Sequence, residues 1–335
     1  MAHRDARRLD EDDVRNRPTR YGSRARSKQR PAHDDAAAGM VVTIDRGRFT
    51  VLLAGSGVQL TAMRARELGR KSIAVGDRVA VVGDLTGQPD TLARIVRIED
   101  RRTVLRRTAD DNDPFERVIV ANADQLLIVA ALASPPPAYG LIDRCVVAAL
   151  TAGLEPILLL TKADLAAPDE VLANYADLDI PAVVTSVGAD LGPVRRLLGG
   201  KVTVFVGHSG VGKSTLVNAL VPGAARSTGA VSEIGKGRHT STSVFALPLP
   251  APERGWVIDT PGVRSFGLAH VGAQDLLWAF PDLEDGAVQC PSRCEHRSAS
   301  EGCRLDAWVA DGHSSAARLA GFRRLLASRT DLGVG

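Results

Sequence analysis

A glycine-rich segment in the middle of the chain has the residue types that bind phosphate groups. GHSGVGKST (207–215) follows the apolar run KVTVFVG and precedes the helical pattern STLVNAL. Glycines let backbone N–H groups wrap a phosphate, Lys213 can reach the β- and γ-phosphates, and the Ser214 hydroxyl can bind Mg²⁺. This segment is a predicted P-loop, which does not separate ATP from GTP. Its residues are Gly207, His208, Ser209, Gly210, Val211, Gly212, Lys213, Ser214 and Thr215.

The tetrapeptide DTPG (259–262) has the residues that complete a phosphate site. It follows the apolar run WVI, and it comes after the P-loop in the chain. We expect Asp259, at the end of a strand, to hold Mg²⁺ through water. The Gly262 N–H would contact the γ-phosphate.

The stretch TKAD (161–164) indicates which base is bound. The Asp164 carboxylate can accept two hydrogen bonds from guanine that adenine cannot offer, and the stem of Lys162 can pack along the base. A second stretch, TSVG (185–188), can bring a backbone N–H to guanine O6. TKAD begins with threonine where asparagine is commoner. The predicted base-binding residues are Thr161, Lys162, Ala163, Asp164, Thr185 and Ser186.

The order of these motifs is unusual, because both base motifs precede the P-loop and DTPG follows it. Loops at strand ends of one sheet can build the same pocket wherever the chain is cut, and permutation is tolerated at exposed connections. The order therefore predicts a circularly permuted GTPase domain. Its new C-terminal end lies just after DTPG, so hydrolysis can move whatever is fused there.

A glycine-rich, basic segment (227–247) lies between the P-loop and DTPG. We expect Thr240 to bind Mg²⁺ and to close over the γ-phosphate. Val263 follows DTPG, so an amide side chain that could position water is missing there. His239 is the favoured candidate for that catalytic role, beside Lys213 and Thr240; Arg264 or a group from a partner are the alternatives. Low intrinsic turnover and activation by a partner are expected.

Three cysteines and a histidine lie within fourteen residues near the C-terminus: Cys290, Cys294, His296 and Cys303. In a cytosolic chain this pattern favours tetrahedral Zn²⁺ over disulfides. Four protein ligands leave no open position, so the site is expected to be structural. Cys145 lies in an apolar helical pattern and is most simply a buried core residue.

The elements that must position these residues fall into two patterns. Five short β-like segments within 39–100 predict a small barrel, with an OB-fold as the natural candidate. Such a barrel can bind nucleic acid or serve only as a spacer. From residue 118 onward, apolar strands alternate with helices, which predicts a parallel sheet covered on both faces. The segment 270–335 is richer in helix signals.

Composition indicates an ordinary globular protein in the cytoplasm. Of 335 residues, 44% are hydrophobic and 24% charged, and the sequence shows no signal peptide or apolar run long enough to cross a membrane. Residues 14–30 hold seven basic residues and no acidic one. This stretch predicts a disordered arm, either a solvated tail or a segment that binds nucleic-acid phosphates.

With these motifs in this order, the sequence resembles a known family, the circularly permuted ribosome small subunit-dependent GTPase A. The resemblance covers about residues 39–330 and rests on VGDRV, ANADQLLIV, TKAD, GHSGVGKST, GRHTST, DTPGVRSF and the cysteine cluster. It implies an OB-fold, a GTPase domain and a zinc-bearing helical domain that grip 16S rRNA on the small ribosomal subunit, with Mg²⁺, GTP and one Zn²⁺ per chain. Two positions depart from the family pattern. Ser241 stands where threonine is usual, and the zinc ligands read C-x3-C-x-H-x6-C instead of C-x4-C-x-H-x5-C.

The prediction is therefore an α/β protein in four parts. These are a basic arm (1–38), an OB-fold barrel (39–102), a permuted GTPase domain (103–269) and a zinc-binding helical domain (270–335). We expect a monomeric Mg²⁺-dependent GTPase, stimulated by the small subunit and released from it by hydrolysis. One alternative is an rRNA-binding module whose hydrolysis is incidental. Another is an ATPase in which TKAD is coincidental.

Overall fold

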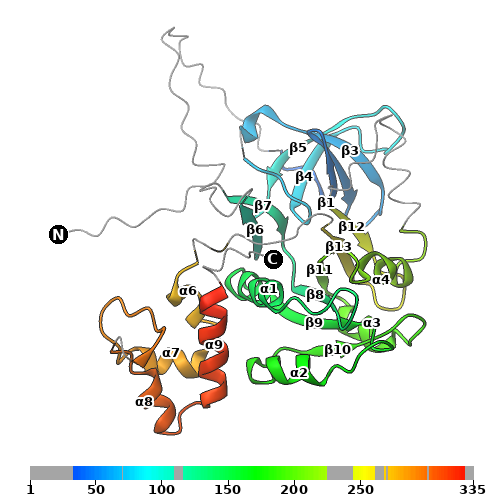
Figure 1. Cartoon of the computed structure of the whole chain (residues 1–335). Coiled ribbons are helices and arrows are strands. Elements are labelled where there is room, and N and C mark those ends of the chain that lie inside the picture. The colour runs from blue at the N-terminus through cyan, green and yellow to red at the C-terminus, as the bar shows by residue number, and fades with distance from the viewer. Residues whose placement is uncertain are drawn as a thin grey trace, which may run out of the picture. The chain divides into compact units, whose positions relative to one another are not determined.

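The structure, a computed structural model, describes residues 33–69, 71–108, 116–224, 244–260, 268, 271–299 and 302–328 (Figure 1). Residues 1–32 of the predicted basic arm lie outside these ranges. The chain forms two compact units: residues 1–122 with 243–245, and residues 123–242 with 246–335. Within the described residues, no helix is long and apolar enough to cross a membrane.

The first unit contains a closed barrel of five strands. They are β1 (Ala37–Asp45), β2 (Arg48–Leu53), β3 (Gln59–Arg64), β4 (Arg78–Gly83) and β5 (Ala93–Ile98), with a short 3₁₀ helix η1 (Arg66–Leu68) after β3. The strand order β1-β2-β3-β5-β4 is closed by pairing of β1 with β4, and β3 pairs with β5 in parallel. This is the topology of an OB-fold, as predicted. Buried and exposed residues alternate along β2, so Phe49, Val51 and Leu53 point into the barrel core.

A two-stranded ribbon, β6 (Val104–Thr108) and β7 (Glu116–Ala121), also belongs to the first unit. The sequence analysis did not identify these strands, and the predicted domain boundaries place them at the start of the GTPase domain. Gly76 explains how the ribbon approaches the barrel, since a Cβ there would lie 2.1 Å from the Ala121 carbonyl oxygen. The Asn122 side chain accepts the Arg102 N–H at 2.9 Å and donates to the Gly76 carbonyl at 3.1 Å.

The second unit is built on a sheet in the order β10-β9-β8-β11-β13-β12. Its strands are β8 (Gln125–Ala131), β9 (Glu155–Thr161), β10 (Ala182–Val184), β11 (Val202–Gly207), β12 (Phe245–Pro248) and β13 (Trp256–Asp259). The neighbouring pairs β10–β9, β9–β8, β8–β11 and β11–β13 are all parallel. Every residue of β8 is buried, as expected for a strand covered on both faces.

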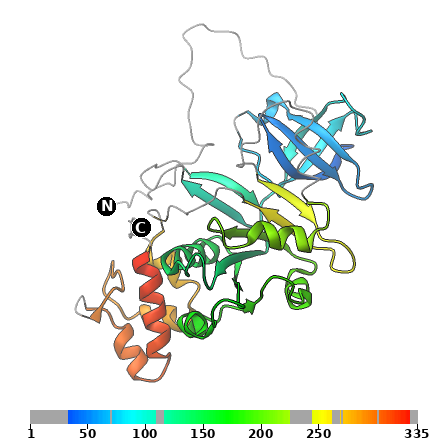
Figure 2. The same ribbon diagram turned by 45° about the vertical axis from the view of Figure 1, so that its right-hand side comes forward.

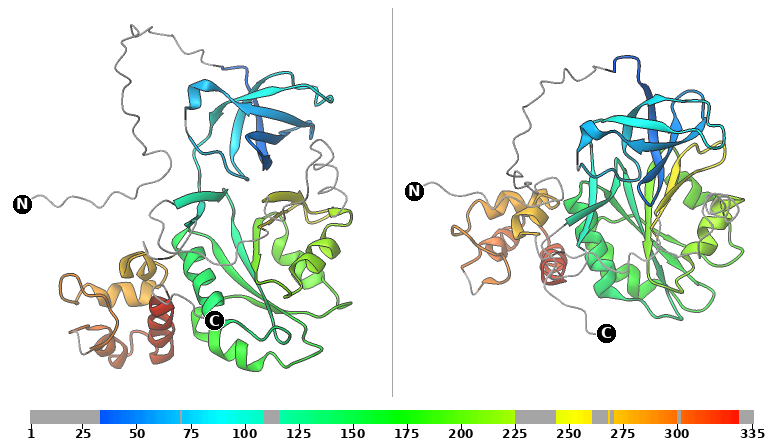
Figure 3. Two further views of the ribbon diagram at one scale, coloured as in Figure 1. Left: turned by 45° about the horizontal axis from the view of Figure 1, so that its top comes forward. Right: turned by 90° about the horizontal axis from the view of Figure 1, so that it is seen from above.

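Helices cover both faces of this sheet (Figures 1 and 3). On one side lie α1 (Tyr139–Thr151) and α2 (Asp169–Tyr175), the latter continued by η2 (Ala176–Leu178); on the other lie α3 (Gly192–Leu198) and α4 (Lys213–Leu220). The chain runs outward from β8 through β9 to β10 and then crosses back to β11 on the other side of β8. In such sheets ligands bind at the carboxyl ends of the strands, where the strand order reverses.

Four further helices lie in the described residues of the C-terminal helical segment. They are α6 (Ala273–Leu277), α7 (Pro281–Ala287), α8 (Leu305–Ala310) and α9 (Ala316–Ser328). Its small core contains Phe280 and Phe322, whose rings meet edge to face with centroids 5.4 Å apart. Helix α9 lies beside α1 in Figures 1 and 2.

Candidate nucleotide site and metal centre

The P-loop residues lie between the end of β11 at Gly207 and the start of α4 at Lys213. The structure explains why glycine is required at three positions of this loop. A Cβ on Gly207 would lie 2.6 Å from the Val129 carbonyl oxygen, so β11 passes close to β8. Gly210 and Gly212 have φ values of +82° and +94°, which favour glycine. The loop therefore leads directly into the N-terminus of α4, where backbone N–H groups can bind a phosphate.

Lys213 and Asp259 form an ion pair at the carboxyl edge of the sheet. Lys213 begins α4 and Asp259 ends β13, and their side chains are only 12% and 8% exposed. The next residue, Thr260, donates a hydrogen bond of 2.8 Å to the Phe205 carbonyl of β11, which fixes the end of β13. The predicted phosphate-binding cation and the predicted magnesium ligand, 46 positions apart in the sequence, are thus brought together.

Thr161, the last residue of β9, connects the base motif with the P-loop. Its buried hydroxyl donates a hydrogen bond of 2.6 Å to the Val211 carbonyl and lies 3.4 Å from the Ala130 carbonyl. It also packs against the P-loop, since a Cβ on Gly212 would lie 3.9 Å from its hydroxyl oxygen. A threonine at this position therefore joins two loops that are far apart in sequence.

Lys162 contacts a loop that the sequence analysis did not assign to the site. Its backbone has a φ of +61°, and its ammonium donates a hydrogen bond to the Ser134 carbonyl. Ser134 lies in the loop after β8, within the SPPP segment. The predicted strand β8 could have indicated this loop from the sequence. Its carboxyl end must reach the same edge of the sheet as the ends of β9 and β11.

The two base motifs are held together by backbone hydrogen bonds. Ala163 N–H donates to the Thr185 carbonyl at 3.2 Å, and Thr185 N–H donates to the Leu160 carbonyl at 2.8 Å. Ser186 follows, and its carbonyl accepts the Ala189 N–H at 3.2 Å in a turn. The Asp164 side chain is exposed beside them.

Several predicted residues lie outside the described part of the chain. They are His239, Thr240, Gly262 and the alternative water-positioning residue Arg264, together with Ser241 and Val263. For the other predicted nucleotide residues, the structure places the four motifs at the ends of β9, β10, β11 and β13. These strands form two pairs of sheet neighbours, β10–β9 and β11–β13, on either side of β8. The predicted permuted order therefore builds one continuous edge.

The cysteine cluster forms a compact group of metal-ligand atoms. The ligand atoms of Cys290, Cys294, His296 and Cys303 all lie within 4.8 Å of one another. Two sulfur atoms, of Cys290 and Cys303, are 3.9 Å apart, and the Cys303 sulfur is 3.7 Å from His296 Nδ1. Tetrahedral zinc, with bonds of about 2.3 Å to sulfur and about 2.0 Å to nitrogen, requires separations of roughly 3.8 and 3.6 Å. The altered ligand spacing thus still closes a set compatible with one Zn²⁺.

The protein around the cluster orients it and raises a thiol pKa. Burial, with the neighbouring Cys290 and Cys294, raises the pKa of Cys303 to about 11. Arg304 N–H donates to the Cys290 sulfur at 3.3 Å, and Arg323 Nε donates to the His296 carbonyl at 3.2 Å. A cation would offset the unfavourable proximity of three thiolates.

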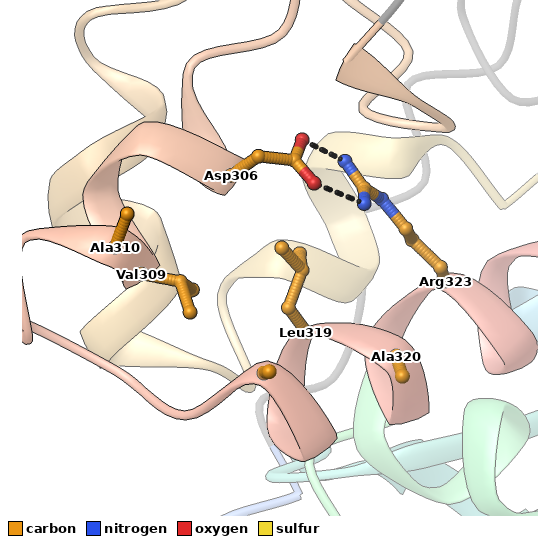
Figure 4. A pocket seen from close by; sticks show the side chains of 7 residues that line it. Asp306, Val309, Ala310, Leu319, Ala320 and Arg323 are labelled. Carbon is orange, nitrogen blue, oxygen red and sulfur yellow. Dashed lines mark hydrogen bonds and ion pairs between the residues drawn. The ribbon is translucent and has the colours of Figure 1, made fainter.

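Arg323 also forms a two-bond ion pair with Asp306 of α8, at 2.8 and 2.6 Å (Figure 4). The pair stands at one side of a groove between α8 and α9. The remaining lining residues are Val309, Ala310, Ala316, Leu319 and Ala320, and none belongs to the predicted nucleotide site.

Cys145 takes no part in the metal group. It lies on α1 with 1% of its surface exposed, and burial raises its thiol pKa to about 12. The prediction of a buried core cysteine is confirmed.

Comparison with known proteins gives consistent results along the chain. The RsgA GTPase family model matches residues 98–269. A Shewanella oneidensis protein named small ribosomal subunit biogenesis GTPase RsgA is 38% identical over 269 residues, covering 77% of this chain and 74% of the relative. An Ectopseudomonas mendocina protein of the same name is 42% identical over 220 residues. That alignment spans only 63% of the length of either protein.

Two crystal structures share the fold. YjeQ from Thermotoga maritima is 26% identical, with a TM-score of 0.65 over 88% of this chain and 99% of that chain. YloQ, described as a circularly permuted GTPase, has a TM-score of 0.63 over 90% of this chain and 98% of that chain, at 22% identity. These similarities, with the observed strand order, confirm the predicted permuted GTPase fold.

Proposed function

Because the chain belongs to the RsgA GTPase family, we propose that it is a Mg²⁺-dependent GTPase that binds the small ribosomal subunit and acts in its late assembly. GTP hydrolysis drives its release from the subunit. One observation carries this proposal: Thr161 and Lys213 connect the base motif, the P-loop and Asp259 at a single sheet edge, although these motifs occur in permuted order.

We assign phosphate and Mg²⁺ binding to the P-loop together with Thr240 and Asp259. Backbone N–H groups of residues 207–215 wrap the phosphates, and the Lys213 ammonium turns toward the β- and γ-phosphates. Ser214, Thr240 and Asp259 would hold Mg²⁺, which would neutralise phosphate charge there. The ion pair between Lys213 and Asp259 supports this assignment, since the groups assigned to phosphate and to metal lie next to each other.

Base recognition uses the loops after β9 and β10. The Asp164 carboxylate accepts the two guanine N–H groups, and a backbone N–H in 185–188 donates to guanine O6. Leu165 and Val187, 59% and 84% exposed, give these loops apolar surface against which a base can pack. Lys162 lies along the base with its head held by the Ser134 carbonyl.

Hydrolysis requires a group that positions water, and His239 is the proposed residue. Val263 lacks a hydrogen-bonding side chain, so turnover of the isolated protein is slow and the small subunit, through 16S rRNA, stimulates it. Cys290, Cys294, His296 and Cys303 would hold one Zn²⁺, which would stabilise the folded form of the C-terminal helical segment. The protein acts as a monomer in the cytoplasm, where small subunits mature.

Equilibrium binding tests the nucleotide assignment. The purified chain is titrated into fluorescent GDP and, separately, fluorescent ADP, each with Mg²⁺ and with EDTA. The proposal predicts binding of GDP at least about a hundredfold tighter than of ADP, because a carboxylate left unpaired by adenine is costly. Equal affinities would contradict guanine selection and favour the alternative in which TKAD is coincidental.

A further inference from the structure

Helix α9 contacts the stretch of chain that connects the two base-binding loops. That stretch consists of α2, η2 and β10, and it lies between the base motifs 161–164 and 185–188. A contact that restrains this stretch therefore restrains both base-binding loops. In the described structure α9 touches η2 and also runs along α1, which follows the Ser134 loop (Figure 1).

Arg318 of α9 connects the C-terminal helical segment with η2. Its Nη1 donates to the Asp177 carbonyl at 3.1 Å and to the Asp179 carboxylate at 2.7 Å. Its Nε donates to both carboxylate oxygens of Asp282 on α7, at 2.9 Å each. One guanidinium therefore bridges α7 and the end of η2, a geometry that lysine could not reproduce.

Arg324, nearly two turns later, makes the second connection. Its Nε donates to Asp143 of α1 at 3.2 Å, its Nη1 lies 3.4 Å from the Asn174 side-chain oxygen, and its guanidinium stands 5.0 Å from the centre of the Tyr175 ring. The Tyr175 hydroxyl donates to the same carboxylate at 2.9 Å. Asp143 is 4% exposed, so this carboxylate relies on both partners.

Helix α9 and η2 lie close together at a point between Arg318 and Arg324. A Cβ on Gly321 would lie 2.7 Å from Leu178 Cδ2, so α9 can approach η2 only through a glycine. Arg324 Nη2 is buried and has no hydrogen-bond partner among the described residues. Arg323, the neighbouring arginine, instead makes two short bonds to Asp306 within the helical segment. The α9 contact with α1, α2 and η2 (the α9 seam) is thus less completely satisfied than the segment's own contacts.

The C-terminal helical segment also follows Asp259 and Thr260 in the chain, at the phosphate end of the site. Chain continuity attaches it there, and the α9 seam attaches it on the base side. We propose that Arg318 and Arg324 are positioning residues through which docking of α9 and binding of guanine nucleotide strengthen each other. This inference rests on the proposed function. By thermodynamic linkage, the factor by which docked α9 tightens nucleotide binding equals the factor by which nucleotide tightens docking.

Nucleotide affinity gives the first test. The Arg318→Ala/Arg324→Ala double variant and the wild type are compared for GDP affinity, with Arg97→Ala as control, because Arg97 makes an exposed ion pair with Glu99 in the barrel. The double variant is expected to bind GDP about tenfold more weakly, within the usual range of coupling between sites. The control stays within about twofold. Asp179→Ala, at a residue whose side chain is 82% exposed, is expected to give a smaller loss without affecting folding.

Hydrogen exchange supplies the readout that a merely structural role would not change. Saturating GDP is expected to slow amide exchange in α9 and η2 of the wild type, and to lose that effect in the double variant at unchanged zinc content. The single substitution Arg324→Lys keeps the charge beside Asp143. This variant should therefore bind GDP more tightly than the double variant. Wild-type affinity in both the double variant and Asp179→Ala, or no GDP effect on exchange in α9, would overturn the inference. Failure of the wild type to bind GDP at all would instead overturn the proposed function.

Discussion

The Thr161 hydroxyl donates a hydrogen bond of 2.6 Å to the Val211 carbonyl, across fifty positions of the sequence. Thr161 ends the strand that carries the base motif, and Val211 lies inside the P-loop. The bond fixes the distance between the parts of the site assigned to base and phosphate. It also explains why threonine serves where asparagine is commoner, since one donor at this point is enough to satisfy the carbonyl.

Removing this donor should weaken nucleotide binding. Thr161→Val keeps the shape but leaves the Val211 carbonyl without its 2.6 Å partner in a buried setting, at a cost of about 1–3 kcal/mol. We expect GDP affinity to fall about tenfold, measured by titration with fluorescent GDP. Thr161→Ser, which retains the hydroxyl, is the matched control and should bind within about threefold of the wild type. Equal weakening by serine and valine would contradict this role of the hydroxyl.

Asp164→Asn should change the base that is bound. An amide cannot accept both guanine N–H groups, whereas it can donate to the additional oxygen of xanthine. Affinity for GDP should fall by at least about a hundredfold and affinity for xanthosine diphosphate should rise. Competition titrations with the two nucleotides check this. Unchanged GDP affinity would mean that TKAD does not read the base.

Asp259→Asn should abolish the effect of Mg²⁺ on nucleotide affinity. The substitution removes the charge that pairs with Lys213 and, in our assignment, holds the metal through water. Wild-type GDP affinity should drop about tenfold in EDTA, whereas the variant should bind equally in both buffers. Asp311→Asn, at an exposed residue after α8, is the control. A variant that keeps the full Mg²⁺ response would place the metal elsewhere.

Zinc content should depend on the four-ligand cluster and on pH. Because the Cys303 pKa is raised to about 11, metal binding must displace a proton, and protons compete increasingly as pH falls. We expect one zinc per chain at pH 8, loss of zinc as the pH is lowered toward 5, and loss at pH 8 in Cys294→Ser. Cys145→Ala should retain full zinc, as measured with a chromogenic chelator. Full zinc in Cys294→Ser would show that the cluster is not the site.

Local patterns in the sequence predicted most of the elements. Apolar periodicity predicts the five barrel strands and the alternating strands and helices. The positions of the four motifs follow from residue types that have a specific role in nucleotide binding. The sequence alone predicts Thr161, Lys213 and Asp259 as site residues, because phosphate and base recognition demand those residue types at strand ends.

Contacts between distant segments could not be predicted in the same way. The Ser134 carbonyl is a backbone group that any residue could supply, so its bond to Lys162 leaves no trace in the sequence. The pairing of Arg324 with Asp143 joins residues 181 positions apart, and nothing in the local sequence of either residue indicates the other as its partner. The β6–β7 ribbon was missed because its charged residues obscure the alternation expected of a strand.

GTP hydrolysis with and without purified small ribosomal subunits tests the central proposal most directly, with ATP and large subunits as controls. We predict slow hydrolysis of GTP alone and strong stimulation by small subunits, with no effect of large subunits and no turnover of ATP. Unstimulated hydrolysis together with intact GTP-dependent binding to small subunits would contradict this account and identify an rRNA-binding module in which hydrolysis is incidental.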